Sequence, residues 1–248
     1  MKYAVYVEGQ SELLFVADVL QKYYNYDPAC CGFLCINLTA DDFERMTFPQ
    51  QGDENSTDYY QIVNVNNDNL VVSKLRKDIP GLLAQGYNVI LGLRDVFGDT
   101  YKQITANQPV IDRAKIEQMH AAQTLAINAP AGSDCRLHFA IMEYEAWMLA
   151  LIENYVVSKG KEIGEIVGQT GLDITSDDLE TTVYHPYPLA QKIFQACGED
   201  YHKHGKESFS FLSTLTVADY EQLRHSGRCA SFAKFINSLL GVSNPVSP

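Results

Sequence analysis

The N-terminal segment contains the pattern that most restricts how this chain can fold. Residues 2–7 form a mainly apolar run of valine, tyrosine and alanine that ends on Glu8 and Gly9. Apolar residues then recur at helical spacing from Leu13 to Tyr24. The pattern predicts a strand, a turn in which Gly9 lets the backbone bend sharply, and a helix. Because ligands bind at the carboxyl ends of strands in open α/β sheets, Glu8 is expected at the mouth of a site.

The alternation of apolar runs and helical segments continues to residue 142. Further strands are expected at 32–38, 60–65, 87–93 and 135–142, and helices at 70–83 and 112–127. The polar stretch 40–58 is expected to be a loop, and Pro80 is expected to end or kink its helix. This order of elements predicts an α/β fold with a mostly parallel sheet and helices on both faces.

The pattern changes after residue 142 and becomes mainly helical. Helices are expected over 143–157, 189–197, 209–215, 217–224 and 229–240, with a connecting stretch and a short helix over 160–184. We therefore expect an α/β domain over 1–157 and a mainly helical C-terminal extension over 158–248 packed on it. The final residues, 243–248, are expected to fray.

Charge and composition argue against several classes of protein. A net charge of −12 disfavours a protein that coats nucleic acid through bulk electrostatics, but it is compatible with an enzyme whose bound metal meets the phosphates. Without an apolar run of about eighteen residues or a signal-peptide layout, we expect a cytoplasmic protein with no membrane partner. The scattered cysteines fit reduced core thiols, and reading Cys30, Cys31 and Cys35 as half of a metal site lacks a matching Cys/His pair.

Acidic residues follow three of the expected strands. Glu8 follows the first strand. Asp95 ends the buried strand that begins at residue 87, and Glu143 and Glu145 follow the strand over 135–142. Carboxyl ends of parallel strands meet at one edge of a sheet, and clustered carboxylates repel one another unless a cation lies between them. All-oxygen ligation favours a hard ion, Mg²⁺ or Mn²⁺. Alternatively, each acid is a helix N-cap or first-turn residue favoured by the helix dipole.

These motifs resemble those of a TOPRIM-like bacterial family, the domain of unknown function numbered 4276, which is related to the TOPRIM domains of OLD-type nucleases. The resemblance rests on residues 7–12, the strand that ends on Asp95, and residues 143–149, 201–205 and 229–232. It implies a TOPRIM-like, Rossmann-like fold and a metal-dependent phosphodiesterase or nuclease acting on DNA or RNA. It also implies a separate ATPase partner in anti-phage defence.

The resemblance further implies roles for single residues. Glu8 resembles the TOPRIM glutamate, which is a general acid/base or a metal ligand. Asp95 resembles the first acid of an Asp-x-Asp motif, and Glu145 resembles the third acid of the site, with Glu143 and Glu12 in support. These residues would hold a magnesium or manganese ion that activates water for attack on a phosphodiester.

The chain departs from the family pattern at one position. Phe97 stands where the second aspartate is expected, so that acid is missing unless Asp99 serves instead. A two-metal mechanism needs enough carboxylates to hold two ions close together. The competing hypothesis is therefore a non-catalytic interaction module, a TOPRIM scaffold with a degenerate metal site. A third hypothesis, a nucleotide-binding α/β protein, lacks a glycine-rich phosphate loop.

Basic residues are enriched late in the chain. Lys203 and Lys206 are candidates for neutralising charge on a transferring phosphate. Together with Arg224, Arg228 and Lys234 they could form a phosphate-facing patch, and the alternative is an ordinary solvated helical face.

Overall fold

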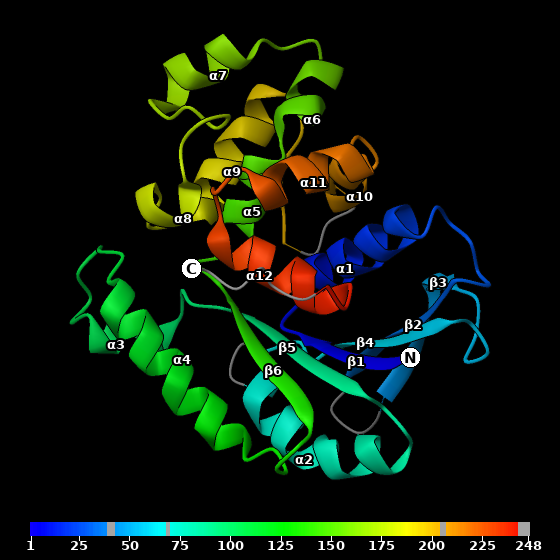
Figure 1. The fold of residues 1–248 in the computed structure, drawn as a ribbon. Coiled ribbons are helices and arrows are strands. Elements are labelled where there is room, and N and C mark those ends of the chain that lie inside the picture. Colours follow the sequence, from blue (N-terminus) through cyan, green and yellow to red (C-terminus); the bar gives the residue numbers. More distant parts are fainter. Residues whose placement is uncertain (39–42, 68–69, 204–206, 243–248) are drawn as a thin grey trace. The chain divides into compact units, whose positions relative to one another are not determined.

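The computed structural model describes residues 1–38, 43–67, 70–203 and 207–242 (Figure 1). The chain forms two compact units, one made of Met1–Arg94 and Ala114–Phe139 and the other of Asp95–Arg113 and Ala140–Pro248. These units do not coincide with the expected domains 1–157 and 158–248. Compactness does not test which segments fold independently, so the domain boundary stays a prediction.

The first unit is built around a six-stranded sheet in the order β3-β2-β4-β1-β5-β6. Its strands are β1 (Lys2–Val7), β2 (Cys31–Leu38), β3 (Phe43–Gln51), β4 (Asp58–Asn64), β5 (Val89–Asp95) and β6 (Asp134–Ala140). β1 pairs in parallel with β4 and β5, β2 pairs in parallel with β4, and β3 runs antiparallel to β2. The expected mostly parallel sheet is confirmed.

Helices cover both faces of this sheet, as expected (Figure 1). They are α1 (Gln10–Tyr23) on one face and α2 (Leu70–Ala84) and α4 (Arg113–Ile127) on the other. On the α2 face, the Tyr6 hydroxyl donates to Asp78 Oδ2 over 3.0 Å. Gly92 admits the same helix closely, because a Cβ there would lie 2.6 Å from Leu75 Cδ1. The unit is a Rossmann-like α/β fold.

β1 and α1 form where the opening pattern predicts them. Leu13, Val16 and Leu20 are fully buried, which explains their helical spacing. Glu8, directly after β1, is buried as well. Gly9 has φ −145°, an extended conformation that any residue can adopt. The expectation that this turn needs the backbone freedom of glycine is therefore wrong.

One local expectation is wrong, and of the two outcomes expected at Pro80, an end or a kink of the helix, the structure excludes the end. The stretch 40–58 is not all loop, since it contains the edge strand β3. The described side chains of that strand are mostly exposed, and an exposed edge strand needs no apolar pattern. α2 does not end at Pro80 but continues to Ala84. Ile79 and Leu82 are buried on either side of the exposed proline and hold the helix in place.

The second unit is mainly helical in its described residues. Its helices are α3 (Asp99–Ile104), α5 (Glu145–Ala150), α6 (Glu153–Ser158), α7 (Ile163–Thr170), α8 (Leu179–Thr182), α9 (Pro186–Ala196), α10 (Glu207–Leu212), α11 (Val217–His225) and α12 (Ala230–Leu239). No helix in the described part of the chain is long and apolar enough to cross a membrane. The expected fraying of 243–248 concerns residues outside the described ones.

The prediction of a single helix over 143–157 is wrong. The segment forms two short helices, α5 and α6, which meet at Leu151 and Ile152. Both residues at this junction are buried, so the apolar run turns and continues into the core of the unit.

Trp147 on α5 packs in the core of this unit. Its ring is fully buried and stacks on Phe235 of α12, with 5.8 Å between centroids. Phe232 approaches the indole edge-on at 5.7 Å. Such aromatic pairs join α5 to α12, and α5 begins with a residue of the candidate site.

Candidate functional site

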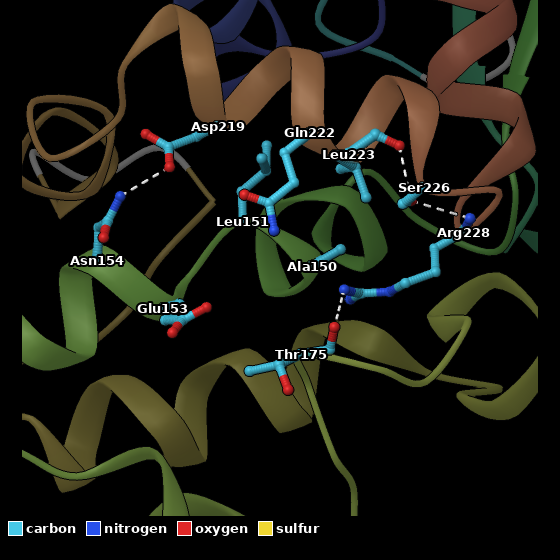
Figure 2. Close-up of a pocket in the computed structure, with 10 residues that line it drawn as sticks. All are labelled: Ala150, Leu151, Glu153, Asn154, Thr175, Asp219, Gln222, Leu223, Ser226 and Arg228. Carbon is cyan, nitrogen blue, oxygen red and sulfur yellow. Dashed lines mark hydrogen bonds between the residues drawn. The ribbon is translucent and has the colours of Figure 1, made fainter.

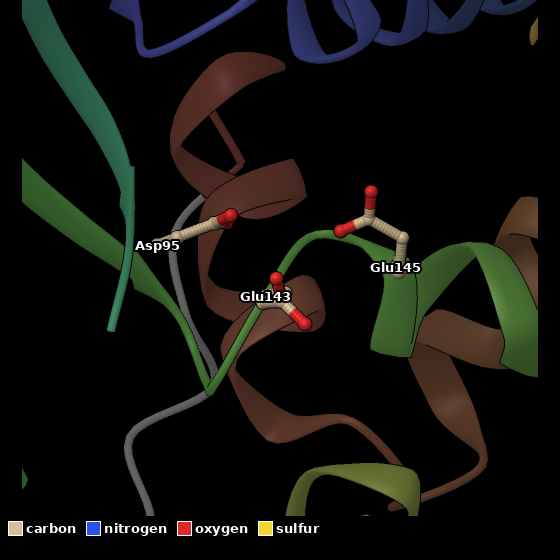
Figure 3. A group of neighbouring side chains, drawn as sticks. All are labelled: Asp95, Glu143 and Glu145. Carbon is tan, nitrogen blue, oxygen red and sulfur yellow. The ribbon is translucent and has the colours of Figure 1, made fainter. Parts of the chain in front are cut away.

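Three buried carboxylates of the second unit lie together (Figure 3). Asp95 is the last residue of β5, Glu143 lies between β6 and α5, and Glu145 is the first residue of α5. One carboxylate oxygen from each lies within 4.8 Å of the other two. Figure 3 shows the three carboxyl groups pointing toward one another. Three of the acids expected at strand ends are therefore brought together, and this carboxylate cluster could hold a metal ion.

The backbone around the cluster sets the directions of these side chains. The Phe97 N–H donates to the carbonyl of Met142 over 2.6 Å, which keeps the segments after β5 and β6 side by side. Met142 has φ +64°, a left-handed conformation that is uncommon for a residue with a side chain. The Tyr144 N–H then donates to Asp95 Oδ1 over 2.8 Å. The turn thus binds the first acid to the segment that carries the two glutamates.

A lysine ammonium lies among the three carboxylates. Lys203 Nζ is 3.0 Å from Glu143 Oε1, 3.4 Å from Glu145 Oε2 and 3.5 Å from Asp95 Oδ2. Buried carboxylates are stable only when cations or hydrogen-bond donors compensate for lost hydration. The side chains around this point therefore already accommodate one positive charge.

Further donors hold the two glutamates in place. The Tyr187 N–H, in the first turn of α9, donates to Glu143 Oε2 over 3.0 Å. The Tyr201 hydroxyl donates to Glu145 Oε1 over 3.2 Å. Glu145 is also in the first turn of its own helix, α5. For Glu145, the helix-terminus role that was the alternative is therefore present alongside its place in the cluster.

His185 lies beside the cluster. Its Nε2 lies 3.6 Å from Glu143 Oε2, and its side chain is 41% exposed. Partial burial lowers the pKa of His185, and the charges of Lys102 and Lys203 lower it further, against the opposing influence of Glu143. The lowered pKa favours the neutral form of the imidazole.

Replacing Lys203 with methionine should destabilise the metal-free protein. Breaking a fully buried ion pair costs about 3–5 kcal/mol, and because this lysine side chain is 34% exposed we expect about 2 kcal/mol. Urea unfolding in EDTA measures the loss, and added Mg²⁺ should recover much of it by supplying the missing positive charge.

The matched control is Lys234→Met, which removes an exposed lysine from α12 and should change stability by less than about 0.5 kcal/mol. Equal losses in the two variants, or a loss in Lys203→Met that Mg²⁺ does not reduce, would contradict this account of the cluster.

The remaining candidate residues lie outside the cluster. Glu8 belongs to the first unit, so its expected place in a site with Asp95 stays a prediction. Asp99 is the exposed first residue of α3 and is not one of the three grouped acids. Lys206 lies outside the described residues.

Phe97, which stands in place of the second aspartate, packs among rings that the sequence did not indicate. It stacks on His185 with centroids 4.2 Å apart and planes at 25°. Tyr184 meets it edge-on at 5.4 Å, and Lys102 Nζ lies 4.3 Å from its ring centroid. No spacing pattern connects residues so far apart in the chain, so these neighbours of the site could not be found from the sequence.

A separate shallow pocket of about 160 Å³ lies in the second unit (Figure 2). Asn154 and Asp219 on its wall are hydrogen-bonded to each other over 2.8 Å. Arg228 donates to the carbonyls of Ile174 at 2.7 Å and Asp177 at 3.0 Å. These polar groups are hydrogen-bonded to other protein groups, and the residues of the carboxylate cluster do not line the pocket. We therefore assign no function to the pocket.

The late basic residues are not all available as a phosphate-facing patch. Arg228 binds backbone carbonyls, as described above, and Arg224 donates to Asn237 Oδ1 over 2.6 Å. Arg224 also forms an ion pair with Glu221 at 2.8 Å. Of the late basic residues with described positions, Lys203 is the one among the carboxylates.

Glu180 is a further buried carboxylate, with a structural role. Its Oε1 accepts hydrogen bonds from Trp147 Nε1 at 2.9 Å and from the Ser231 N–H at 3.2 Å. Ser231 lies in the first turn of α12, so the carboxylate caps this helix. Burial raises the pKa of Glu180, although the hydrogen bonds from Ser231 and Trp147 lower it in part.

Wild-type stability should fall, relative to a Glu180→Gln variant, as the pH rises through the raised pKa of Glu180. The folded protein keeps a proton on this group over a pH range in which the unfolded chain has released it. Folding is therefore linked to proton uptake there, and this contribution weakens with increasing pH. Urea unfolding at several pH values should show the variant gaining stability over wild type as pH rises. A constant difference would contradict the assignment.

Comparison of the chain with protein-family models, curated protein sequences and solved structures gives no match. The fold and the site define the class by themselves: an α/β protein with a buried carboxylate cluster that could hold a metal ion. The similarity to TOPRIM-like domains rests on the short motifs quoted above and stays a hypothesis.

Proposed function

We propose that the protein is a divalent-metal-dependent phosphodiesterase or nuclease that acts on nucleic acid. The observation that carries the proposal is the convergence of Asp95, Glu143 and Glu145 around a position that already accommodates a cationic group. The three grouped residues all offer carboxylate oxygens, which fit Mg²⁺ or Mn²⁺ better than softer ions. These three residues would hold the ion.

The chain's own groups have defined tasks in this proposal. A bound divalent ion would polarise the phosphodiester and lower the pKa of a water molecule. The Tyr187 N–H and the Tyr201 hydroxyl keep Glu143 and Glu145 oriented. Lys203, released from part of its contact with the carboxylates, would donate to the transferring phosphate and stabilise its developing charge.

The acids of the second unit favour one metal ion over two. Phe97 offers no ligand at the position of the second aspartate, and Asp99 is exposed and outside the group of three. Two ions a few ångströms apart would need more carboxylates than these. Glu8 is the remaining candidate for a further ligand or a general acid/base, and its role stays a prediction.

The cellular role in the proposal comes from the family resemblance alone. On that basis we expect a TOPRIM-like domain over 1–157 that works in the cytoplasm with a separate ATPase partner in anti-phage defence. DNA and RNA are both candidate substrates.

Phe97 supports one alternative, a non-catalytic interaction module on the same scaffold. Its ring is packed against His185 and Tyr184, so the position is built for packing and not for ligation. Metal binding without cleavage, even after addition of an ATPase partner, would favour this alternative.

The experiment that tests the proposal is cleavage of labelled DNA and RNA by the purified chain. Single-stranded and duplex substrates are incubated with Mg²⁺ or Mn²⁺, and EDTA provides the metal-free control. Cleavage that persists in EDTA, or in variants of the three carboxylates, would reject the proposal.

A further inference from the structure

An aromatic group lies beside the carboxylate cluster. Its central pair is Phe97 and His185, stacked with centroids 4.2 Å apart. Tyr184 supports Phe97 edge-on at 5.4 Å, and Lys102 Nζ lies 4.3 Å from the same ring centroid. All four residues belong to the second unit, as does the carboxylate cluster.

The outer ring of this stack is accessible and lies close to the acids. His185 is 41% exposed, whereas Phe97 is half-buried beneath it. His185 Nε2 is 3.6 Å from Glu143 Oε2, so the imidazole directly neighbours a carboxylate of the cluster. A group that stacks on His185 would therefore lie next to the carboxylates that would hold the ion.

The stack is also held in a fixed orientation. His185 precedes Pro186 at the start of α9, where its backbone is set by the helix terminus. The backbone of Phe97 is fixed by the hydrogen bond from its N–H to the Met142 carbonyl. A rigid platform loses little conformational entropy when a flat ligand binds it.

With a divalent ion on the three carboxylates, the charge near the stack would suit a phosphate backbone. The protein carries a net charge of −12, yet two ammonium groups lie here, Lys102 at the Phe97 ring and Lys203 among the carboxylates. Aromatic faces combined with lysines are the features with which proteins bind unpaired nucleotides.

We infer that His185, backed by Phe97, is a stacking platform for an unpaired nucleobase next to the carboxylate cluster, and that the substrate is single-stranded nucleic acid. This inference rests on the proposed function. Bases inside a duplex already stack on their neighbours and cannot reach the imidazole, so the platform selects unpaired strands. His185 is in this sense a positioning residue, which fixes where the strand lies relative to the ion.

The test is binding of fluorescein-labelled oligothymidylate and oligouridylate, measured by anisotropy in Ca²⁺, which replaces Mg²⁺ to limit turnover. A duplex of the same length is the comparison. His185→Ala should weaken single-strand binding by about 5- to 150-fold, the value of one stacked base. His185→Phe, which keeps a flat ring, should stay within about threefold of wild type. The two oligonucleotides separate DNA from RNA as the source of the base.

The matched control is His225→Ala, which removes an exposed histidine from α11 and should leave binding unchanged. Equal losses in His185→Ala and His185→Phe would mean that the imidazole acts through hydrogen bonding and would overturn the inference. No loss in His185→Ala, or duplex binding as tight as single-strand binding, would overturn it as well.

Failure of the inference can be told from failure of the proposed function. If wild type and His185→Ala cleave nucleic acid equally well, the function stands and the platform is rejected. If nothing is cleaved but single strands bind in a His185-dependent manner, the platform stands and the nuclease proposal is rejected. If both hold, His185→Ala should raise KM for single strands far more than it lowers kcat.

Discussion

Cleavage of single-stranded nucleic acid in Mg²⁺ or Mn²⁺ should fall by more than about 100-fold when Asp95 is replaced with asparagine. Loss of a residue that merely supports a metal ligand typically costs 10- to 100-fold, so loss of a ligand charge should cost more. The amide keeps the size of the side chain and an oxygen that can accept the Tyr144 N–H. The fold is therefore expected to persist, as circular dichroism can check. Glu143→Gln and Glu145→Gln should behave in the same way.

The control for this experiment is Asp99→Asn. It makes the same chemical change on an exposed residue of α3 that lies outside the three grouped acids. Its activity should match wild type. A parallel fall in Asp95→Asn and Asp99→Asn, or full activity in Asp95→Asn, would show that the carboxylate cluster is not the reaction site.

Glu8→Gln extends the same assay to the first unit. On the family resemblance, this variant should lose cleavage while remaining folded. A loss as large as that of Asp95→Asn would support a shared site, and unchanged cleavage would limit the site to the second unit.

Metal ions should also stabilise the folded protein by a large and specific amount. At a concentration about 100 times Kd, a ligand bound only by the folded state adds about 2.7 kcal/mol to the free energy of unfolding. For a chain of this length, that corresponds to a rise in Tm of about 5–10 °C. The double variant Asp95→Asn/Glu143→Gln should show almost no rise. Without metal it should be at least as stable as wild type, because two clustered negative charges are removed.

A matched double variant, Asp99→Asn/Glu153→Gln, removes two exposed acids from the same unit and should keep the full response to metal. Thermal unfolding is followed in EDTA and in increasing Mg²⁺ or Mn²⁺. An equal rise in Tm in both double variants would mean that the ion binds elsewhere.

The sheet was predictable because buried strands have an apolar pattern that can be read in the sequence. All residues of β5 are buried, and the strand is apolar along its length except at Arg94 and at Asp95 of the carboxylate cluster. β3 was missed because an edge strand with exposed side chains carries no such trace. The split between α5 and α6 was missed because the residues at the junction are buried and apolar, so the apolar pattern continues across the point where the helix ends.

The three acids of the cluster were also predictable, from one rule of architecture. Each lies at or just after the end of a strand, and parallel strands present their carboxyl ends at one edge. Their proximity could therefore be inferred before any contact was known. Their hydrogen bonds to Tyr144, Tyr187 and Tyr201 could not.

By itself, then, the sequence determined the mostly parallel α/β sheet and the acids that end its strands, because both depend on local apolar patterns. Only the tertiary structure placed the Lys203 ammonium among the carboxylates and stacked His185 on Phe97. These contacts join segments that are distant in the chain, and in the same unit α5 packs against α8, α9 and α12. Local periodicity shows which side of an element is buried, but not which other element covers it.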